Sequence, residues 1–464
     1  MKKALIVAYY FPPIAASGSL RPLGFCRYLE QYGWSPRVLT TEPRSVYPPL
    51  QIDETLNQGL PLSLQVDRIP SANPLHTLIT VRDKLRSELK RLFSSKSKQP
   101  IEGNEFSKKD TISESDGRLT AYKDLILDWI FSFPDPQCFW LRPAIRRMSE
   151  MSVNKRPDVV FATGSPWTGL LVGRALAQKF HVPFVADFRD PWMGGNPYKR
   201  QMAASLQRRA RKFEKAVCAA AVRVVANTEE LREQFVAEYP EFKKKFVTIA
   251  NGFDSDGVTP SKEGALSNHL TLSPAAGGQL EFCHFGTVYG ERNPFCFLQA
   301  IKELYAEHRL APERLRVRCV GSWQVSDEHC EVIARELEQK GILRRDPPVP
   351  REVCLQQMAR AQTLLVFQPA SPLQIPAKIY EYIATGRPLL VIGGEGATAH
   401  LVEQHQLGHC CANRVADIKT LLLRLATGQT QIDPPQPSVT ARFDYRMLTG
   451  ELAKVFDAAY AVKR

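Results

Sequence analysis

The chain has 464 residues, of which 44% are hydrophobic and 23% charged, as is typical of a globular protein with two or three domains. Its 61 Lys and Arg against 48 Asp and Glu give a net charge of +13, so we expect an anionic partner: a membrane surface, nucleic acid or a phosphorylated substrate. No stretch approaches the roughly 18 uncharged apolar residues of a membrane-spanning helix, which argues against an integral membrane protein.

The chain begins with the pattern of a nucleotide-binding α/β domain. Residues 4–8, ALIVA, form a continuous apolar run that predicts a strand buried on both faces of a parallel sheet. A loop over 12–18, a helix over 21–31 and a strand at 38–40 are predicted to follow. Because the first apolar run is short and ends at two prolines, a strand is favoured over a secretory signal peptide.

A polar insertion is predicted over about 82–118. Residues 82–98 carry seven basic side chains, and the following residues are rich in Ser and Lys. Two interpretations remain open: a solvated helix that leads into a disordered insertion, or a basic amphipathic element on anionic lipid.

Further apolar runs form two series, which predict two domains. The first domain, residues 1–255, continues with strands at 158–162, 184–186, 222–226 and 246–249. Residues 256–278 are rich in Gly, Ser and Pro and are predicted to be a linker. The second domain, residues 279–440, has strands at 280–285, 315–320, 363–367 and 388–392. Residues 441–464 contain a final predicted helix, over 445–461. The sequence therefore predicts two Rossmann-like parallel-sheet domains that face each other across a cleft, where ligands of such sheets bind.

Two motifs of the second domain have the chemistry of a phosphate site. In IPAKIYEYIATGRP, a proline begins a helix whose first turn carries Lys378 and Glu381 on one face. The helix start and Lys378 suit a pyrophosphate and Glu381 suits ribose hydroxyls, with an ordinary surface ion pair as the alternative. In HFGTVYGERNP, Gly286 permits close backbone approach and Arg292 offers two donors to phosphate oxygens, with a plain turn as the alternative.

Two loops of the first domain point toward the same cleft. The segment YFPPIAASGSLR follows the first strand and lacks the GxGxxG spacing of a dinucleotide site. The segment DFRDPW follows a later strand and contains Arg189 and Asp190. Because such charges are costly to bury unpaired, both a structural ion pair and a catalytic role remain open.

Seven motifs occur in an order that resembles one family nearly from end to end. They are YFPP…SGSLR, PDVVFATGSPWTGLLVGRAL, VPFVADFRDPW, VRVVANTEELREQF, IANGFD, HFGTVYGERNP and IPAKIYEYIATGRPLL. This pattern resembles the GT-B glycosyltransferases of the GT4-like group (family 4, group 1). The resemblance implies retaining, hexosyltransferase-type transfer from a nucleoside-diphosphate sugar bound to the C-terminal domain, to an acceptor on the N-terminal domain, without a cofactor or metal. It also implies that the final helix crosses back to the first domain.

The motifs and the resemblance together assign roles to individual residues. The donor site is expected to contain Gly18, Gly286, Thr287, Arg292, Lys378 and Glu381. Glu381 matches the ribose-binding second glutamate of the family's E-x7-E motif, and Arg292 matches its phosphate-binding lysine. Charge on the departing diphosphate would be stabilised by Arg292 and Lys378. Asp190 and Arg189 are the catalytic candidates, with Asp190 orienting or deprotonating the acceptor.

Three positions depart from the family pattern. Leu373 stands where the first glutamate of E-x7-E is expected, Thr287 replaces a common arginine, and Arg189 replaces a common histidine. Two alternatives to a transferase therefore remain: a nucleotide-sugar epimerase of the same fold, and a catalytically degenerate GT-B protein that binds without turnover.

A second basic segment, residues 199–215, suggests the partner. It has seven basic side chains and one acidic one, few aromatics and no nucleic-acid-binding module, so anionic lipid is favoured over nucleic acid. We then expect the acceptor to be a glycan or a lipid-linked molecule, and the enzyme to act in the assembly of a cell-surface polysaccharide or a glycolipid. Ten cysteines without repeated spacing predict a cytoplasmic protein, peripheral on the membrane.

Three remaining signals are interpreted as structural. Asp254-Ser255-Asp256 spells the metal-binding DxD by chance, and the His and Cys residues between His400 and Cys411 lack zinc-site spacing. For His284, a core position is favoured over a substrate contact.

Overall fold

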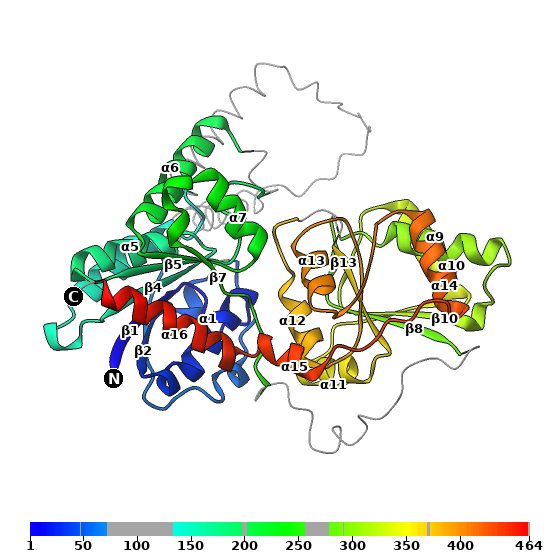
Figure 1. The fold of residues 1–464 in the computed structure, drawn as a ribbon, viewed down its shortest axis with the longest axis horizontal. Coiled ribbons are helices and arrows are strands. Elements are labelled where there is room, and N and C mark those ends of the chain that lie inside the picture. Colours follow the sequence, from blue (N-terminus) through cyan, green and yellow to red (C-terminus); the bar gives the residue numbers. More distant parts are fainter. Residues whose placement is uncertain are drawn as a thin grey trace, which may run out of the picture.

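The computed structural model describes residues 1–462 apart from 47, 72–132, 197–201, 256–277, 291 and 369–371. The insertion predicted at 82–118 and nearly all of the predicted linker lie outside the described residues. The described chain forms two lobes, each built on a parallel sheet (Figure 1). The predicted α/β fold with two parallel-sheet domains is thereby confirmed. Among the described residues, no helix has the length and apolar character needed to cross a membrane.

The first lobe has seven parallel strands in the order β3-β2-β1-β4-β5-β6-β7. They are β1 (Lys2–Ala8), β2 (Trp34–Thr41), β3 (Gln65–Ile69), β4 (Val159–Gly164), β5 (Phe184–Phe188), β6 (Arg223–Ala226) and β7 (Phe246–Thr248). The apolar run of β1 pairs with β2 and β4 and is buried on both faces, as its sequence requires.

Helices cover both faces of this sheet. They are α1 (Ser17–Tyr28), α4 (Leu141–Ser149), α5 (Thr168–Phe180), α6 (Ala204–Ala220), α7 (Glu229–Glu238) and α16 (Tyr445–Ala461). On one face, Ile6 of β1 packs in a cluster with Phe25 of α1 and Leu452 of α16. On the other face, Leu5 and Val7 belong to a cluster with residues of α4 to α7. The first core is therefore completed by the last helix of the chain.

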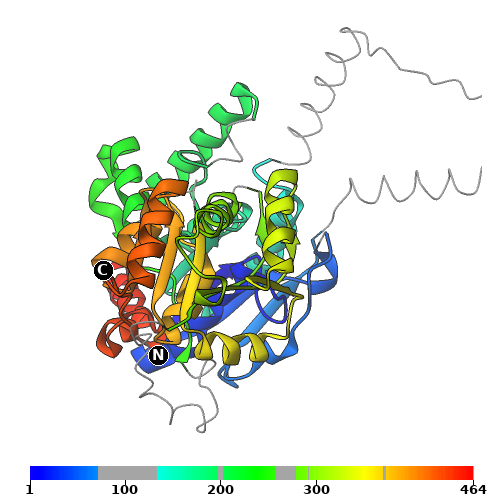
Figure 2. The same cartoon turned by 90° about the vertical axis from the view of Figure 1, so that its right-hand side faces the viewer.

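The second lobe has six parallel strands in the order β12-β10-β8-β13-β14-β15 and a separate pair, β9 with β11. The strands are β8 (Leu280–Phe285), β9 (Val288–Tyr289), β10 (Leu315–Val320), β11 (Trp323–Gln324), β12 (Leu343–Asp346), β13 (Thr363–Gln368), β14 (Leu389–Gly393) and β15 (Gly408–Cys411). Figure 2 looks onto this lobe, with helices on both sides of its strands.

The helices of the second lobe divide between two cores. They are α9 (Phe295–Ala306), α10 (Glu328–Gln339), α11 (Arg351–Arg360), α12 (Ala377–Ala384), α13 (Ala397–Gln404), α14 (Val415–Ala426) and the short α15 (Pro437–Thr440). Phe282 of β8 packs with α9, α10 and α14 on one face. Phe285, three positions further along β8, packs with α11, α12 and α13 on the other face. Side chains alternate between the faces of a strand, so residues an odd number of positions apart point to opposite faces.

The chain passes between the lobes twice, and the two crossings pair with each other. The amide of Phe253 donates to the carbonyl of Phe443 (2.9 Å), and the amide of Tyr445 donates to the carbonyl of Phe253 (2.8 Å). From there α16 lies along α1 of the first lobe (Figure 1), where the Tyr445 and Phe25 rings meet edge to face at 5.7 Å. The final helix thus joins the core of the first lobe.

Candidate functional site

A buried ion pair holds the carboxyl end of β5. The carboxylate of Asp187 accepts hydrogen bonds from Arg21 Nε (3.1 and 3.2 Å), from Arg21 Nη2 (2.8 Å) and from the Thr163 hydroxyl (2.7 Å). Arg21 also donates to the carbonyls of Ile249 (2.9 Å) and Ala250 (2.6 Å), where the chain leaves the first lobe. A charge is tolerated in the interior when its donors are paired in this way. The pair therefore holds in place both the carboxyl end of β5 and the segment, residues 249–250, through which the chain leaves the first lobe.

Gly18 lies against the guanidinium of Arg189. A β-carbon at position 18 would come within 2.7 Å of Arg189 Nη1, so a larger residue there would displace the guanidinium. Because α1 begins at Ser17, Gly18 is in the first turn of the helix; the prediction of a loop through residue 18 was wrong. Gly18 and Ser19 of this turn are buried, and the Ser19 hydroxyl donates to the carbonyl of Ile14 (2.7 Å), which holds the helix start in place.

Asp190 is the carboxylate of this edge that contacts the second lobe. Its Oδ2 accepts a hydrogen bond from the Ser165 hydroxyl (3.3 Å), and its Oδ1 accepts one from Gln374 Nε2 (2.9 Å). Burial raises the pKa of Asp190, whereas the Arg189 cation and the two hydrogen bonds lower it. A carboxyl group with a raised pKa at a strand end has the properties of a general base.

The segment that follows β13 joins the two lobes. The carbonyl of Leu373 accepts a hydrogen bond from the Thr228 hydroxyl (2.9 Å), and a β-carbon on Gly195 would lie 2.3 Å from Leu373 Cδ1. Beside it, His400 Nδ1 lies 2.7 Å from Glu230 Oε1. Leu373 therefore packs its apolar side chain against the first lobe.

The predicted donor residues of the second lobe lie at the carboxyl ends of β8 and β13. Lys378 Nζ is 3.8 Å from Glu381 Oε2, and Glu381 Oε1 accepts a hydrogen bond from Arg351 Nη2 (3.1 Å). A β-carbon on Gly286 would be 3.7 Å from Lys378 Cδ, so the two motifs predicted separately meet here. Arg351, at the start of α11, was not predicted, because a lone arginine after a proline has no distinguishing spacing.

The loop between β8 and α9 carries the remaining predicted residues. Thr287 is half-buried between Gly286 and β9. The amide of Arg292 donates to the Tyr289 carbonyl (2.9 Å), and its guanidinium lies 5.4 Å from the Tyr289 ring centroid. This contact keeps the cation at the loop, in reach of an anionic ligand.

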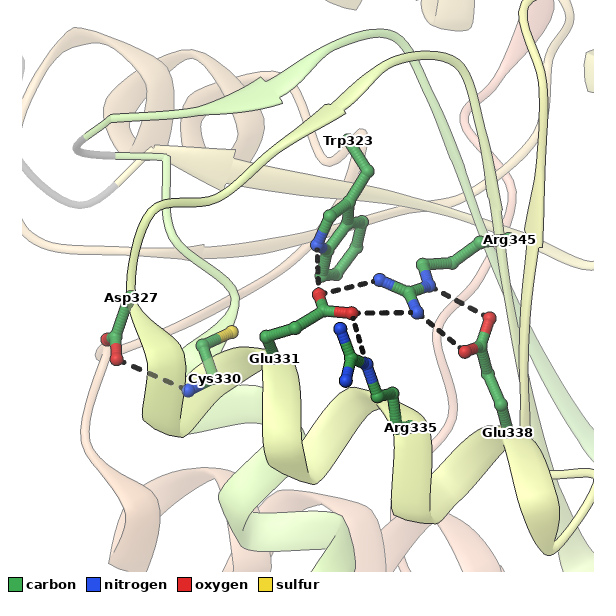
Figure 3. Close-up of polar contacts among 7 residues, drawn as sticks. All are labelled: Trp323, Asp327, Cys330, Glu331, Arg335, Glu338 and Arg345. Carbon is green, nitrogen blue, oxygen red and sulfur yellow. Dashed lines mark hydrogen bonds and ion pairs between the residues drawn. The ribbon is translucent and has the colours of Figure 1, made fainter. Parts of the chain in front are cut away.

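A cavity of about 460 Å³ lies beside this edge, at the ends of β10 and β12. Glu331 accepts hydrogen bonds from Trp323 Nε1 (3.0 Å), Arg345 (2.8 Å) and Arg335 (3.0 Å), as Figure 3 shows. Arg345 also lies 4.9 Å from the Trp323 ring centroid. Because these charges satisfy one another, they form a fixed wall of the cavity.

The described ranges contain no group of three His, Cys, Asp or Glu side chains placed to hold a metal ion. Asp254, from the DxD match, accepts a hydrogen bond from the Tyr28 hydroxyl (2.6 Å) and pairs with Arg27. These contacts attach the end of the first lobe to α1.

Comparison with known proteins agrees with this architecture. Residues 129–252 match the family model of the glycosyl transferase 4-like domain. A D-inositol 3-phosphate glycosyltransferase from Geodermatophilus obscurus is 26% identical over 223 residues, which cover 46% of this chain and about half (48%) of that relative. HepE of Anabaena, solved with UDP and glucose, is 13% identical over 99% of this chain and 100% of its own, with a TM-score of 0.55. Sucrose-phosphate synthase from Thermosynechococcus elongatus is 13% identical over 100% of both chains, with a TM-score of 0.57. These two likenesses establish the fold.

Proposed function

We propose that this chain, a GT-B protein with a glycosyl transferase 4-like domain, is a retaining glycosyltransferase that uses a nucleoside-diphosphate sugar. One observation carries the proposal. The segment 373–381 contacts Asp190 through Gln374 at one end and carries Lys378 and Glu381 at the other. A single stretch of chain thus connects a candidate base to a candidate diphosphate site.

The proposed mechanism is electrostatic and needs no metal. Lys378 and Arg292 hold the β-phosphate and stabilise its growing charge as the bond from the sugar's anomeric carbon to the phosphate oxygen breaks. The acceptor oxygen bonds to that carbon on the face that the diphosphate leaves, which retains configuration. Its proton passes to Asp190. Glu381, held by Arg351, accepts hydrogen bonds from the ribose of the donor. The nucleobase of the donor lies toward the cavity beside Trp323.

Thermal shift with UDP, GDP, ADP, CMP and dTDP tests the donor site. One of them is expected to stabilise the protein with or without Mg²⁺, by about 2.7 kcal/mol at a hundred times its Kd. Glu381→Ala is expected to lose this shift, and Glu352→Ala, at an exposed glutamate of α11, to keep it. No shift with any nucleotide on folded protein would favour a degenerate binding protein. Interconversion of the sugar nucleotide without an acceptor would favour an epimerase.

A second prediction concerns Asp190. Gln374→Ala removes a hydrogen bond to the ionised carboxylate, so the pKa of Asp190, already raised by burial, is expected to rise further. Because a base must be ionised to act, the acidic limb of the pH–rate profile is expected to move to higher pH, by about one unit. Gln339→Ala, at the exposed end of α10, is the control. An unmoved or lowered limb would show that Asp190 is not the base.

The acceptor is proposed to be a glycan or lipid-linked substrate of cell-surface polysaccharide or glycolipid assembly, met at the cytoplasmic face of an anionic membrane. The supporting feature is a set of exposed basic side chains on α4 and α6: Arg142, Arg146, Arg147, Arg208, Arg211, Lys212 and Lys215. The protein is expected to sediment with phosphatidylglycerol vesicles but not with phosphatidylcholine vesicles. Changing Arg208, Arg211 and Lys212 to Gln should reduce this binding several-fold. Equal binding to both vesicles would contradict an electrostatic contact.

A further inference from the structure

His284, near the end of β8, has one satisfied and one unsatisfied ring nitrogen. Nδ1 lies 2.9 Å from the carbonyl oxygen of Leu365, and since a carbonyl only accepts, Nδ1 must carry the proton. Burial lowers the pKa of His284 to about 4, and the nearby Lys378 and Arg292 cations act in the same direction, against the hydrogen bond to Leu365. The ring is therefore neutral at physiological pH, and Nε2 presents a lone pair.

Nε2 is buried and has no hydrogen-bond partner among the described residues. A buried acceptor left unsatisfied is destabilising, so a ligand that supplies a donor would recover this free energy. The atom faces the space over Gly286: a β-carbon there would be 3.8 Å from His284 Nε2 and 3.7 Å from Lys378 Cδ. With φ at +140°, Gly286 leaves this space open between the histidine and the lysine.

The two sides of this space select different chemical groups. The Lys378 ammonium attracts phosphate oxygens, whereas a lone pair on Nε2 repels them and requires an O–H or N–H donor. In a nucleoside-diphosphate sugar, hydroxyl groups flank the diphosphate on both sides. Those of the ribose are assigned to Glu381, which leaves those of the transferred sugar for His284. Leu373 offers no competing side-chain acceptor, because its side chain is apolar and lies against Gly195.

We propose that His284 Nε2 accepts a hydrogen bond from a hydroxyl of the transferred sugar, which makes His284 a residue that selects the donor sugar. This inference rests on the proposed function and extends it: Lys378 holds the diphosphate, and His284 recognises the sugar attached to it. The histidine thus distinguishes the loaded donor from the spent nucleotide.

Calorimetry with matched ligand pairs tests the inference. The pair consists of the nucleoside diphosphate that stabilises the wild type and a sugar nucleotide of the same base, such as UDP with UDP-glucose or GDP with GDP-mannose. His284→Phe keeps a ring against Phe367 but removes the acceptor. It is expected to leave the Kd of the nucleoside diphosphate within twofold and to weaken the sugar nucleotide about tenfold. His284→Gln, which places an oxygen near the position of Nε2, should restore most of the affinity. His405→Phe, at a ring that packs on Phe443, is the control.

Singly deoxygenated sugar nucleotides provide a test on wild-type protein, which does not depend on how the variants fold. One such analogue is expected to bind about tenfold more weakly than the parent, and this difference should vanish in His284→Phe. Equal effects of His284→Phe on nucleotide and sugar nucleotide, or none on either, would overturn the inference alone. Wild-type protein that binds none of the nucleoside diphosphates UDP, GDP, ADP and dTDP, and none of their sugar derivatives, would overturn the proposed donor site and this inference with it.

Discussion

Replacing Arg21 with methionine is expected to lower the free energy of unfolding by about 3–5 kcal/mol, because the change leaves a buried carboxylate without its cation. Asp187 is 0% exposed and, among the residues that the structure describes, retains only the Thr163 hydroxyl as a side-chain donor. The carbonyls of Ile249 and Ala250 lose a donor as well. Urea unfolding followed by tryptophan fluorescence measures the effect.

A second arginine of the first lobe, in β2, provides a matched control. Arg37 also forms two hydrogen bonds to one carboxylate, that of Asp67 (2.6 and 3.1 Å), but the two side chains are 26% and 16% exposed. Arg37→Met is therefore expected to cost less than about 1 kcal/mol. If both variants lose the same free energy of unfolding, burial does not explain the contribution of the Arg21–Asp187 pair to stability. Arg21→Lys, which keeps the charge but not the two-pronged geometry, should fall between wild type and Arg21→Met.

The interior strands were predictable from sequence, whereas several edge strands, β3 and β12 among them, were not. Strands such as β1 and β13 are buried on both faces, so they appear as continuous apolar runs. The strands β3, QVDRI, and β12, LRRD, lie at the ends of their sheets and are largely polar. An edge strand has a neighbour on one side only, and such sequences cannot be distinguished from loops without the partner strand.

In the candidate site, contacts between residues close in sequence were predictable, and contacts between residues far apart in sequence were not. Lys378 and Glu381 lie three residues apart on one helix, so their proximity follows from helical geometry. Gln374 and Asp190 are 184 positions apart, and no periodicity connects them. For His284, the predicted core position is correct for Nδ1 only. The buried, unpartnered Nε2 is set by the glycine two residues later and by a lysine of helix α12, which strand periodicity does not connect to it.

Lys378→Ala is expected to lower kcat about 100- to 1000-fold while weakening donor binding much less. The charge on the β-phosphate grows as the sugar leaves, so a cation at this position stabilises the transition state more than the bound donor. Glu381 keeps its hydrogen bond from Arg351 in the variant, and the ribose contact should therefore survive. Initial rates of nucleotide release at saturating and at low donor concentration separate the two effects.

Lys302→Ala is the matched control for this prediction. Lys302 is also a partly exposed lysine of the second lobe, paired with Glu336 at 2.8 Å on the helices that flank the sheet, and its loss should leave kcat unchanged. Lys378→Arg keeps the charge and should recover part of the rate, whereas Lys378→Met should behave as the alanine variant does. A loss below tenfold in Lys378→Ala would mean that Arg292 alone stabilises the diphosphate. Under the proposed metal-free mechanism, Arg292→Ala would then have to show the larger loss, because Arg292 would supply the remaining side-chain cation at the diphosphate.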